Sequence, residues 1–226
     1  MLEQFPNKDQ IVFKEKFIER YSELTDWDEF VKYSLSFLRR SVRVNTIKTN
    51  NADIKKRLKK WNLKQIPWNK NGFWIHRPER RDIGNTIEHH LGYIYVQEAA
   101  SMIPPLILQP KPGDIVLDMC AAPGSKTSQM AQMMNNEGLI VANDYKGIRL
   151  QSLGINLQRM GLTNTIITLM PGQRFKNFEF DKILVDAPCS GTGTIRKSLK
   201  TIRIWNAGMI KKIAREQKQL ITTAFR

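Results

Sequence analysis

The sequence predicts an α/β fold, in which a Rossmann-like, parallel, doubly wound sheet follows an N-terminal α+β lobe. The first observation is the stretch 114–127, DIVLDMCAAPGSKT, which has the pattern of a buried strand, a turn of small residues and the start of a helix. The second is that short apolar runs alternate with segments of helical periodicity from residue 114 onward. We place the boundary near residues 90–110 and expect domains at 1–100 and 101–226.

Apolar residues at nearly helical spacing predict two packed helices near the N-terminus, with their aromatic side chains in the core rather than in a base-stacking platform. Asn71-Gly72 is a favoured hairpin turn. Pro104-Pro105 should break or kink the helix that starts at Glu98. The elements expected before residue 114 are helices at 9–23, 27–38, 53–61 and 98–108, strands at 41–46 and 92–96, and a hairpin at 66–75.

The Rossmann-like part should contain four strands, each followed by a helix or a turn. Leu150, Leu153, Leu157 and Met160 form one apolar stripe, and Gly161 stands where a helix C-terminal cap belongs. The expected strands are 114–118, 138–143, 165–169 and 182–185, and the expected helices are 127–135, 146–160 and 206–225.

The turn after the first strand indicates the ligand class. Cradles for a pyrophosphate need several glycines, as in G-x-G-x-x-G, whereas this turn contains only Gly124. A nucleotide-like ligand without a diphosphate fits better, and S-adenosylmethionine (SAM) is the obvious one. Asp144 ends the second strand, where Rossmann-like folds place the acid that accepts hydrogen bonds from the ribose. Lys126 either bonds near the pocket or caps the helix, and Arg149 either pairs with Asp144 or lies in solvent.

A second informative turn, DAPCSGTG, follows the fourth strand at residues 186–193. It places an acid, Asp186, three residues before a thiol, Cys189. Methylation at C5 of a pyrimidine needs help, because that carbon is a poor nucleophile. A thiolate that adds to C6 and an acid near N3 supply it, so Cys189 and Asp186 are the candidate catalytic residues. A non-catalytic loop is the alternative.

The net charge of +15 is unevenly distributed along the chain. Residues 31–82 carry 15 bases against 3 acids and residues 196–226 carry 9 against 1, while the segment between them is nearly balanced. Two basic segments suggest an RNA or DNA partner, although a charge run is often only a solvated face. The candidate RNA-binding residues are Arg39, Arg40, Lys55, Lys56, Arg57, Lys59 and Lys60, together with the basic C-terminal segment.

Several classes of protein are disfavoured by the composition. No apolar run is long enough for a membrane helix, and residues 1–10 lack a signal-peptide pattern, so we expect a cytoplasmic protein. Cys120 and Cys189 lie in motif-like turns, which favours reduced thiols over a disulfide. His76, His89 and His90 have no ligand spacing with either cysteine, so no metal site is expected.

The two turn motifs, DMCAAPGSKT and DAPCSGTGT, together resemble the Sun (Fmu-like, nucleolar-protein-type) RNA 5-methylcytosine methyltransferases. RVNTIK at 43–48 and VQEAAS at 96–101 match further patterns of that family, and the resemblance covers roughly residues 40–200. It implies a SAM-dependent RNA cytosine-5 methyltransferase acting on tRNA or rRNA, with an N-terminal lobe that helps to bind RNA. It also implies the SAM-binding residues, which are Cys120, Ala121, Ala122, Pro123, Gly124, Ser125, Lys126, Asp144, Arg149 and Asp186.

Two departures from the family pattern affect these expectations. The family commonly has an acid in the turn after the third strand, where this chain reads Met170-Pro171-Gly172-Gln173. The family also has a nucleophilic cysteine in a later Thr-Cys motif, which this sequence lacks, and its cysteine at the position of Cys189 assists product release. The chain is therefore expected to be the SAM-binding portion of such an enzyme, with an incomplete sheet. The alternatives are a catalytically inactive RNA-binding module with the same fold and, less favoured, an NAD-dependent oxidoreductase.

Overall fold

The computed structural model describes residues 3–77 and 82–226, which form two compact units. The first unit contains residues 1–39 and 188–219, and the second contains residues 40–187 and 220–226. The chain therefore leaves the first unit after residue 39, returns to it at residue 188 and ends in the second. The boundary expected near residue 100 falls inside the second unit, and the division into domains at that point stays a prediction.

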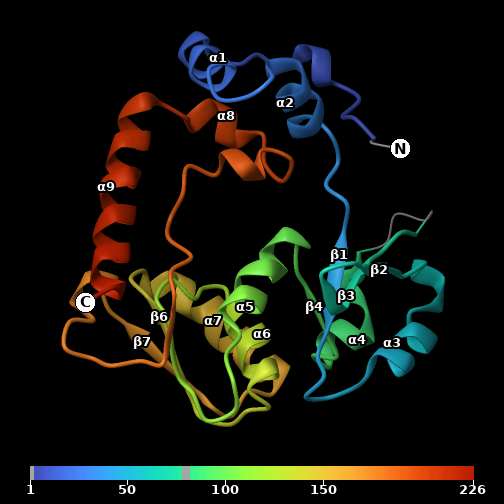
Figure 1. Cartoon of the computed structure of the whole chain (residues 1–226). Coiled ribbons are helices and arrows are strands. Elements are labelled where there is room, and N and C mark those ends of the chain that lie inside the picture. The colour runs from blue at the N-terminus through green and yellow to red at the C-terminus, as the bar shows by residue number, and fades with distance from the viewer. Residues whose placement is uncertain (1–2, 78–81) are drawn as a thin grey trace. The chain divides into compact units, whose positions relative to one another are not determined.

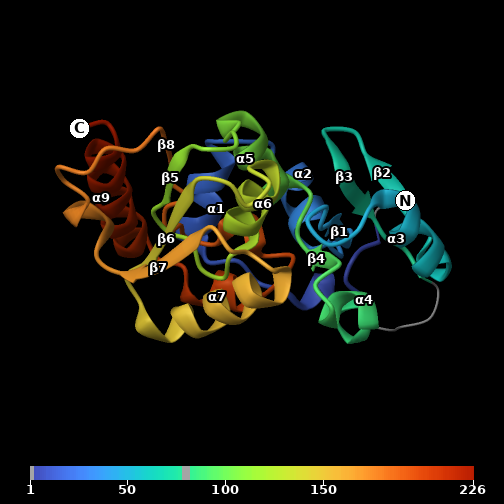
Figure 2. The ribbon, with the colours of Figure 1, turned by 90° about the horizontal axis from the view of Figure 1, so that it is seen from below.

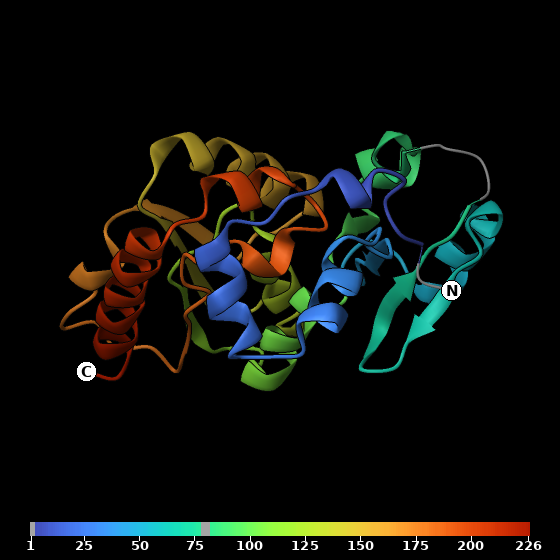
Figure 3. The same ribbon diagram turned by 90° about the horizontal axis from the view of Figure 1, so that it is seen from above.

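The first unit is helical. Its helices are α1 (Glu15–Ser22), α2 (Trp27–Ser34), α8 (Lys200–Ile204) and most of α9 (Ala207–Ala224), with 3-10 turns at Lys8–Gln10 and Thr192–Thr194. In Figure 3 the blue N-terminal helices lie beside the orange-to-red segment that includes α8. Phe13, Phe17 and Trp205 form one buried aromatic core with Ile195 and Ile202. The prediction that the N-terminal aromatics are core residues is confirmed.

The second unit begins with an antiparallel sheet in the order β2-β3-β1-β4. Its core contains Val42, Ile54, Trp61, Phe73 and Ile94. All four residues of β1 are buried, so both faces of this strand are covered. The elements are β1 (Ser41–Val44), α3 (Asn51–Arg57), β2 (Lys64–Ile66), β3 (Asn69–Trp74), α4 (Ile87–His90) and β4 (Ile94–Val96), with 3-10 turns at Lys59–Trp61 and Ile83–Asn85.

The hairpin is present, but its predicted turn is wrong. Ile66 pairs with Asn69, so Pro67 and Trp68 form the turn, and Asn71 and Gly72 lie within β3. The Gln65 side chain fixes this turn, because its Nε2 donates to the carbonyls of Asn69 at 2.7 Å and Gly72 at 2.8 Å. Gly72 serves close packing instead, since a Cβ there would lie 2.8 Å from Met102 Sδ.

The rest of the second unit is the predicted parallel sheet, in the order β7-β6-β5-β8; Figure 1 labels β6 and β7, and Figure 2 labels all four strands. All neighbouring strands are parallel, and β8 pairs with β5. The elements are α5 (Ile103–Leu108), β5 (Ile115–Asp118), α6 (Ser125–Met133), β6 (Leu139–Asp144), α7 (Gly147–Met160), β7 (Thr165–Leu169) and β8 (Lys182–Leu184), with 3-10 turns at Ala100–Met102 and Gly172–Arg174. This order is that of half a Rossmann fold, so the α/β prediction is confirmed.

The predicted break in the segment 98–108 is present, and the prolines at 104 and 105 lie just after it. They occupy the first turn of α5, which starts at Ile103 after a separate 3-10 turn. The first turn tolerates proline because its backbone N–H groups have no partner within the helix. The predicted cap at Gly161 is confirmed by its left-handed φ of 76°.

The two faces of the parallel sheet are covered differently (Figure 2). Val116 and Ile140 pack against Met130 of α6 and Met134, which follows that helix, while Leu153 and Leu157 of α7 pack near Ala142 on the same side. Leu117 and Val141 point to the opposite face, where Phe175 and Leu220 cover them. Leu220, near the end of α9, is buried there, whereas its neighbour Ile221 is 43% exposed. Both faces are therefore closed around the carboxyl ends of β5 and β6.

Candidate functional site

The turn between β5 and α6 is held in place by the neighbouring strands. The backbone N–H of Met119 donates to the Leu184 carbonyl at 3.0 Å, and that of Ala121 donates to the Asn143 carbonyl at 2.7 Å. Gly124, the N-cap residue before α6, has a φ of 99°, which favours glycine. Its missing side chain also leaves room for α7, because a Cβ would lie 3.0 Å from Leu153 Cδ1. The turn is thus a rigid backbone cradle at the end of the first parallel strand.

Asp118, at the end of β5, is a buried carboxyl with only part of its hydrogen-bonding capacity used. Its Oδ2 accepts a hydrogen bond from Thr127 Oγ1 at 2.7 Å, whereas its Oδ1 has no partner among the described residues. Burial raises the pKa of Asp118 to about 7. A raised pKa at a strand end is typical of a functional position.

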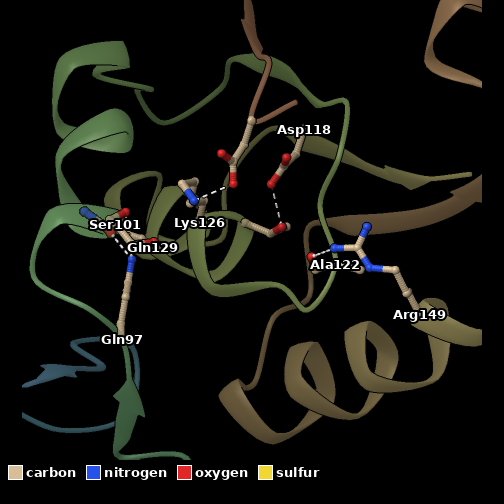
Figure 4. A network of polar contacts seen from close by, with 9 residues as sticks. Gln97, Ser101, Asp118, Ala122, Lys126, Gln129 and Arg149 are labelled. Atoms are coloured by element: carbon tan, nitrogen blue, oxygen red, sulfur yellow. Dashed lines mark hydrogen bonds and ion pairs between the residues drawn. The ribbon is translucent and has the colours of Figure 1, made fainter. Parts of the chain in front are cut away.

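Lys126 and Asp186 form an ion pair, with Nζ and Oδ2 2.5 Å apart. Figure 4 shows the ammonium group of Lys126 on the same side of the turn as the carboxyl group of Asp118. The pair links the first turn of α6 to the chain after β8, where the lysine side chain is 13% exposed and the Asp186 side chain 51%. Lys126 was expected either to bond near the pocket or to cap the helix. Its bond to Asp186 supports the first of these two roles.

Asp144, at the end of β6, is 1% exposed and pairs with Arg149, whose Nη1 lies 2.8 Å from Asp144 Oδ2. The backbone N–H of Lys146 donates to the other carboxylate oxygen at 3.1 Å. Arg149 also donates through Nη2 to the Ala122 carbonyl, which ties it to the first turn (Figure 4). Arg149 therefore pairs with Asp144 instead of lying free in solvent.

The charges of the three strand-end acids all affect the pKa of the Cys120 thiol. Burial, followed by the charges of Asp118, Asp144 and Asp186, raises the pKa of this thiol to about 12. Cys120 is therefore a protonated thiol at neutral pH and is unsuited to nucleophilic attack. An acidic site beside a turn of small residues suits a ligand with a cationic centre and hydroxyl donors, so these residues fit SAM.

Cys189 is exposed and belongs to the first unit, whereas Asp186 belongs to the second. The two residues are close in the chain, and their joint catalytic role stays a prediction. The thiol lies in the DAPCSGTG turn, where the Ser190 and Thr192 hydroxyls are 2.8 Å apart and the Tyr21 hydroxyl bonds to that of Thr192. The turn is thus ordered by contacts within its own unit.

Arg43 was not selected as a site residue from the sequence, although it begins the RVNTIK motif. Its guanidinium is 1% exposed and donates to Gln97 Oε1, to Gln132 and to Ser128 Oγ. These partners are neutral, and burial lowers the Arg43 pKa to about 9. The arginine thus fastens β1 to α6, the helix that begins at the ligand turn.

The seven RNA-binding residues named individually from the sequence are all exposed. Lys55 and Arg57 lie over the rings of Phe73 and Tyr93, so their side chains run along the surface of the antiparallel sheet. The others in the set are Arg39 in the first unit and Arg40, Lys56, Lys59 and Lys60 in the second. Their contact with RNA stays a prediction.

Metal clusters and membrane-spanning helices are two further features that the sequence disfavours. Within residues 3–77 and 82–226, no group of three or more His, Cys, Asp or Glu side chains is arranged to hold a metal ion. In the same part of the chain, no helix combines the length and the apolar character that crossing a membrane requires.

Comparison with known proteins finds a matching family model for each of the two parts of the chain. A family model described as 16S rRNA methyltransferase RsmB/F matches residues 105–226, and one described as the N-terminal domain of 16S rRNA methyltransferase RsmF matches residues 13–99. The tRNA (cytosine(49)-C(5))-methyltransferase of Pyrococcus abyssi is 48% identical over 93% of this chain and 69% of its own length. The ribosomal RNA small subunit methyltransferase F of Shewanella oneidensis is 44% identical over 88% of this chain, which spans only 43% of that relative.

Solved structures agree with these relatives. A methyltransferase homologue from Pyrococcus horikoshii is 38% identical, with a TM-score of 0.82 over 97% of this chain and 72% of that one. The NSun6 protein of Pyrococcus horikoshii shares the fold, with a TM-score of 0.86 at 21% identity over 95% of this chain and 80% of that one. The chain therefore belongs to the RsmB/F (Sun) family of RNA cytosine-5 methyltransferases, whose cofactor is S-adenosylmethionine.

Proposed function

We propose that this chain, alone or as part of a longer protein, methylates C5 of a cytosine in tRNA or rRNA with SAM as the methyl donor. The observation that carries the proposal is that Asp118, Asp144 and Asp186 are each tied to the turn after β5 or to the first turn of α6, through Thr127, Arg149 and Lys126 respectively. This geometry supports a cofactor site at the carboxyl ends of parallel strands. The two named relatives, a tRNA and an rRNA methyltransferase, support both substrate classes equally.

We propose the following roles for residues of the predicted SAM site. The backbone of Cys120–Lys126 approaches the cofactor, and Asp144 accepts hydrogen bonds from the ribose hydroxyls. Because Arg149 and the Lys146 N–H already bond to Asp144, the carboxylate is held in one orientation before the ligand arrives. When bound, SAM supplies an electrophilic methyl group.

Asp186 and Cys189 are proposed to act on the cytosine. Lys126 holds the Asp186 carboxylate at 2.5 Å, while about half of that side chain, 51%, remains exposed for a base. Cys189 supplies a thiol, as the nucleophile at C6 or as the group that assists release. RNA binding is proposed for the exposed cations of residues 55–60, with Arg39 and Arg40, in the cytoplasm.

The test is methyl transfer from labelled SAM to tRNA and rRNA by the 226-residue chain, followed by mapping of 5-methylcytosine. A Glu179→Gln variant, which changes an exposed acid outside the site, serves as the matched control for Asp186→Asn. Transfer that Asp186→Asn abolishes and Glu179→Gln preserves would support the assignment. SAM binding without transfer to either RNA would favour the inactive RNA-binding module.

A further inference from the structure

A cavity of about 720 Å³ lies in the second unit, away from the turn that is proposed to hold SAM. The β2–β3 hairpin, the end of α5 and the second half of α6 line it. Gln129 of α6 is one of its walls, and Figure 4 shows Gln97 bonded to it, well apart from Asp118. The volume lies within the range of pockets that hold small ligands.

The charged side chains that line this cavity are all basic. Arg43, Lys70 and Lys111 line it, and its described lining residues include no acid. Arg43 is fully buried, its hydrogen-bond partners are neutral and its guanidinium lies over the Tyr95 ring, so no described contact supplies a full negative charge opposite it. Buried charges are normally paired, which indicates that an anionic ligand completes the arrangement.

A second observation also indicates a ligand. Asn69, which is 4% exposed, lines the cavity, and its Nδ2 has no hydrogen-bond partner in the described part of the chain. Its Oδ1 accepts from the Asn71 N–H at 2.9 Å, which fixes the side chain. A buried amide donor without a partner costs free energy unless a ligand accepts its hydrogen bond.

The remaining lining groups identify the class of ligand. Trp68 is 44% exposed, and its indole is held by a 3.0 Å bond from Nε1 to the Ala99 carbonyl. A fixed, exposed indole is a platform for stacking a nucleobase. Amide side chains, those of Asn71, Gln109 and Asn135, can bond to the edge of a base.

We propose that this cavity binds a phosphorylated nucleotide of the RNA substrate, at a position other than the methylated cytosine. This inference rests on the proposed function only in naming RNA as the source of the nucleotide. The chemistry of the cavity itself does not depend on that function. Lys70, Lys111 and Asn69 bind the phosphate, Trp68 stacks on the base, and Arg43 supplies the buried positive charge. The site would thereby position the RNA against the methyltransferase domain.

The test is calorimetric titration of the 226-residue chain with cytidine and adenosine 5′-monophosphates, the matching nucleosides and inorganic phosphate. Lys70→Ala with Lys111→Ala should weaken nucleotide binding by at least about tenfold, the scale of one hydrogen bond to a charged group. The matched control is Lys64→Ala with Lys176→Ala, which removes the same charge at exposed positions that do not line the cavity. Equal losses in the two double variants, or no nucleotide binding at millimolar concentration, would overturn the proposal.

Further variants separate the parts of the site. Asn69→Asp keeps the acceptor for Asn71 and replaces the free donor by a carboxylate, so it should abolish phosphate binding, and its thermal unfolding shows whether it folds. Trp68→Leu should weaken nucleotides more than phosphate. A single-stranded RNA must compete with the nucleotide; without competition, the ligand is a free nucleotide and the proposal is wrong. SAM affinity should stay unchanged in all these variants, so a failure of the proposed function would show separately in the SAM titration.

Discussion

Replacing Asp118 by asparagine should remove a strong pH dependence of folding stability. The carboxyl group is 1% exposed, and burial raises its pKa to about 7, against about 3.9 in an unfolded chain. Between these two values the folded protein holds a proton that the unfolded chain has released. The free energy of unfolding therefore falls as pH rises from about 4 to about 7, and becomes constant above that range.

The size of the effect follows from the shift. About three pKa units at about 1.36 kcal/mol each give an upper limit on the order of 4 kcal/mol. The asparagine would not titrate, its oxygen can still accept from Thr127 Oγ1, and its amide adds a donor where Oδ1 had no partner among the described residues. The variant should therefore gain stability relative to the natural chain as pH rises.

The assay is urea unfolding of both proteins at several pH values between about 5 and 8, monitored by tryptophan fluorescence and circular dichroism. The difference between their unfolding free energies should grow with pH and level off near the Asp118 pKa. The Glu179→Gln variant controls for loss of a negative charge at an exposed site. Parallel stability curves for Asp118→Asn and the natural chain would refute the raised pKa.

Three further predictions concern binding and packing. Asp144→Ala should lose about 1.5–3 kcal/mol of SAM binding, the scale of hydrogen bonds to a charged group, as measured by calorimetry; unchanged affinity would contradict the ribose assignment. RNA affinity should fall steeply with salt, and Lys56→Ala, Lys59→Ala and Lys60→Ala together should reduce the slope of log affinity against log salt by about 2–3. A flat salt dependence would mean a solvated basic face. Gly72→Ala should destabilise the fold by about 1–3 kcal/mol in chemical unfolding, because its Cβ meets a methionine sulfur at 2.8 Å; an unchanged midpoint would show that the sulfur moves aside.

Much of the parallel sheet could be predicted because its signals are local. The strands at 115–118 and 165–169 are short apolar runs between turns, and the stripe of α7 repeats with helical period. The errors arose where local signals compete. Asn71-Gly72 is a good turn sequence, but Pro67 comes earlier in the hairpin and Gln65 fixes the turn there.

The site was partly predictable for a similar reason. Acids at strand ends are visible in the sequence, so Asp144 and Asp186 could be selected together with their turns. The sequence could not show whether Lys126 forms an ion pair or lies in solvent. Its partner, Asp186, is 60 positions away in the chain, and the ion pair depends on the conformations of both side chains. Arg43 was missed because Gln132 and Ser128, its partners, lie 89 and 85 residues away in the chain.

The two cysteines should react very differently, which tests the division of roles between the two turns. Burial and three nearby carboxylates raise the pKa of Cys120 to about 12, so roughly one molecule in ten thousand carries the thiolate at pH 8. Cys189 is exposed. Iodoacetamide at about pH 8 should therefore modify Cys189 first, as peptide mass spectrometry would show, and Cys189→Ser should remain almost unlabelled. Modification of Cys120 at a similar rate would refute the shielded thiol.

If that order of reactivity holds, Cys189 is the thiol of this chain that can add to C6 of a cytosine. Addition at C6 needs a thiolate that can reach the base, and the protonated, half-buried Cys120 does not supply one. If Cys189 is that nucleophile, a stable adduct with RNA containing 5-fluorocytosine forms with the natural chain and disappears in Cys189→Ser, which would overturn the expectation that this chain is only the SAM-binding portion of an enzyme. An adduct that persists in that variant would contradict both the order of reactivity and the role proposed for the second turn.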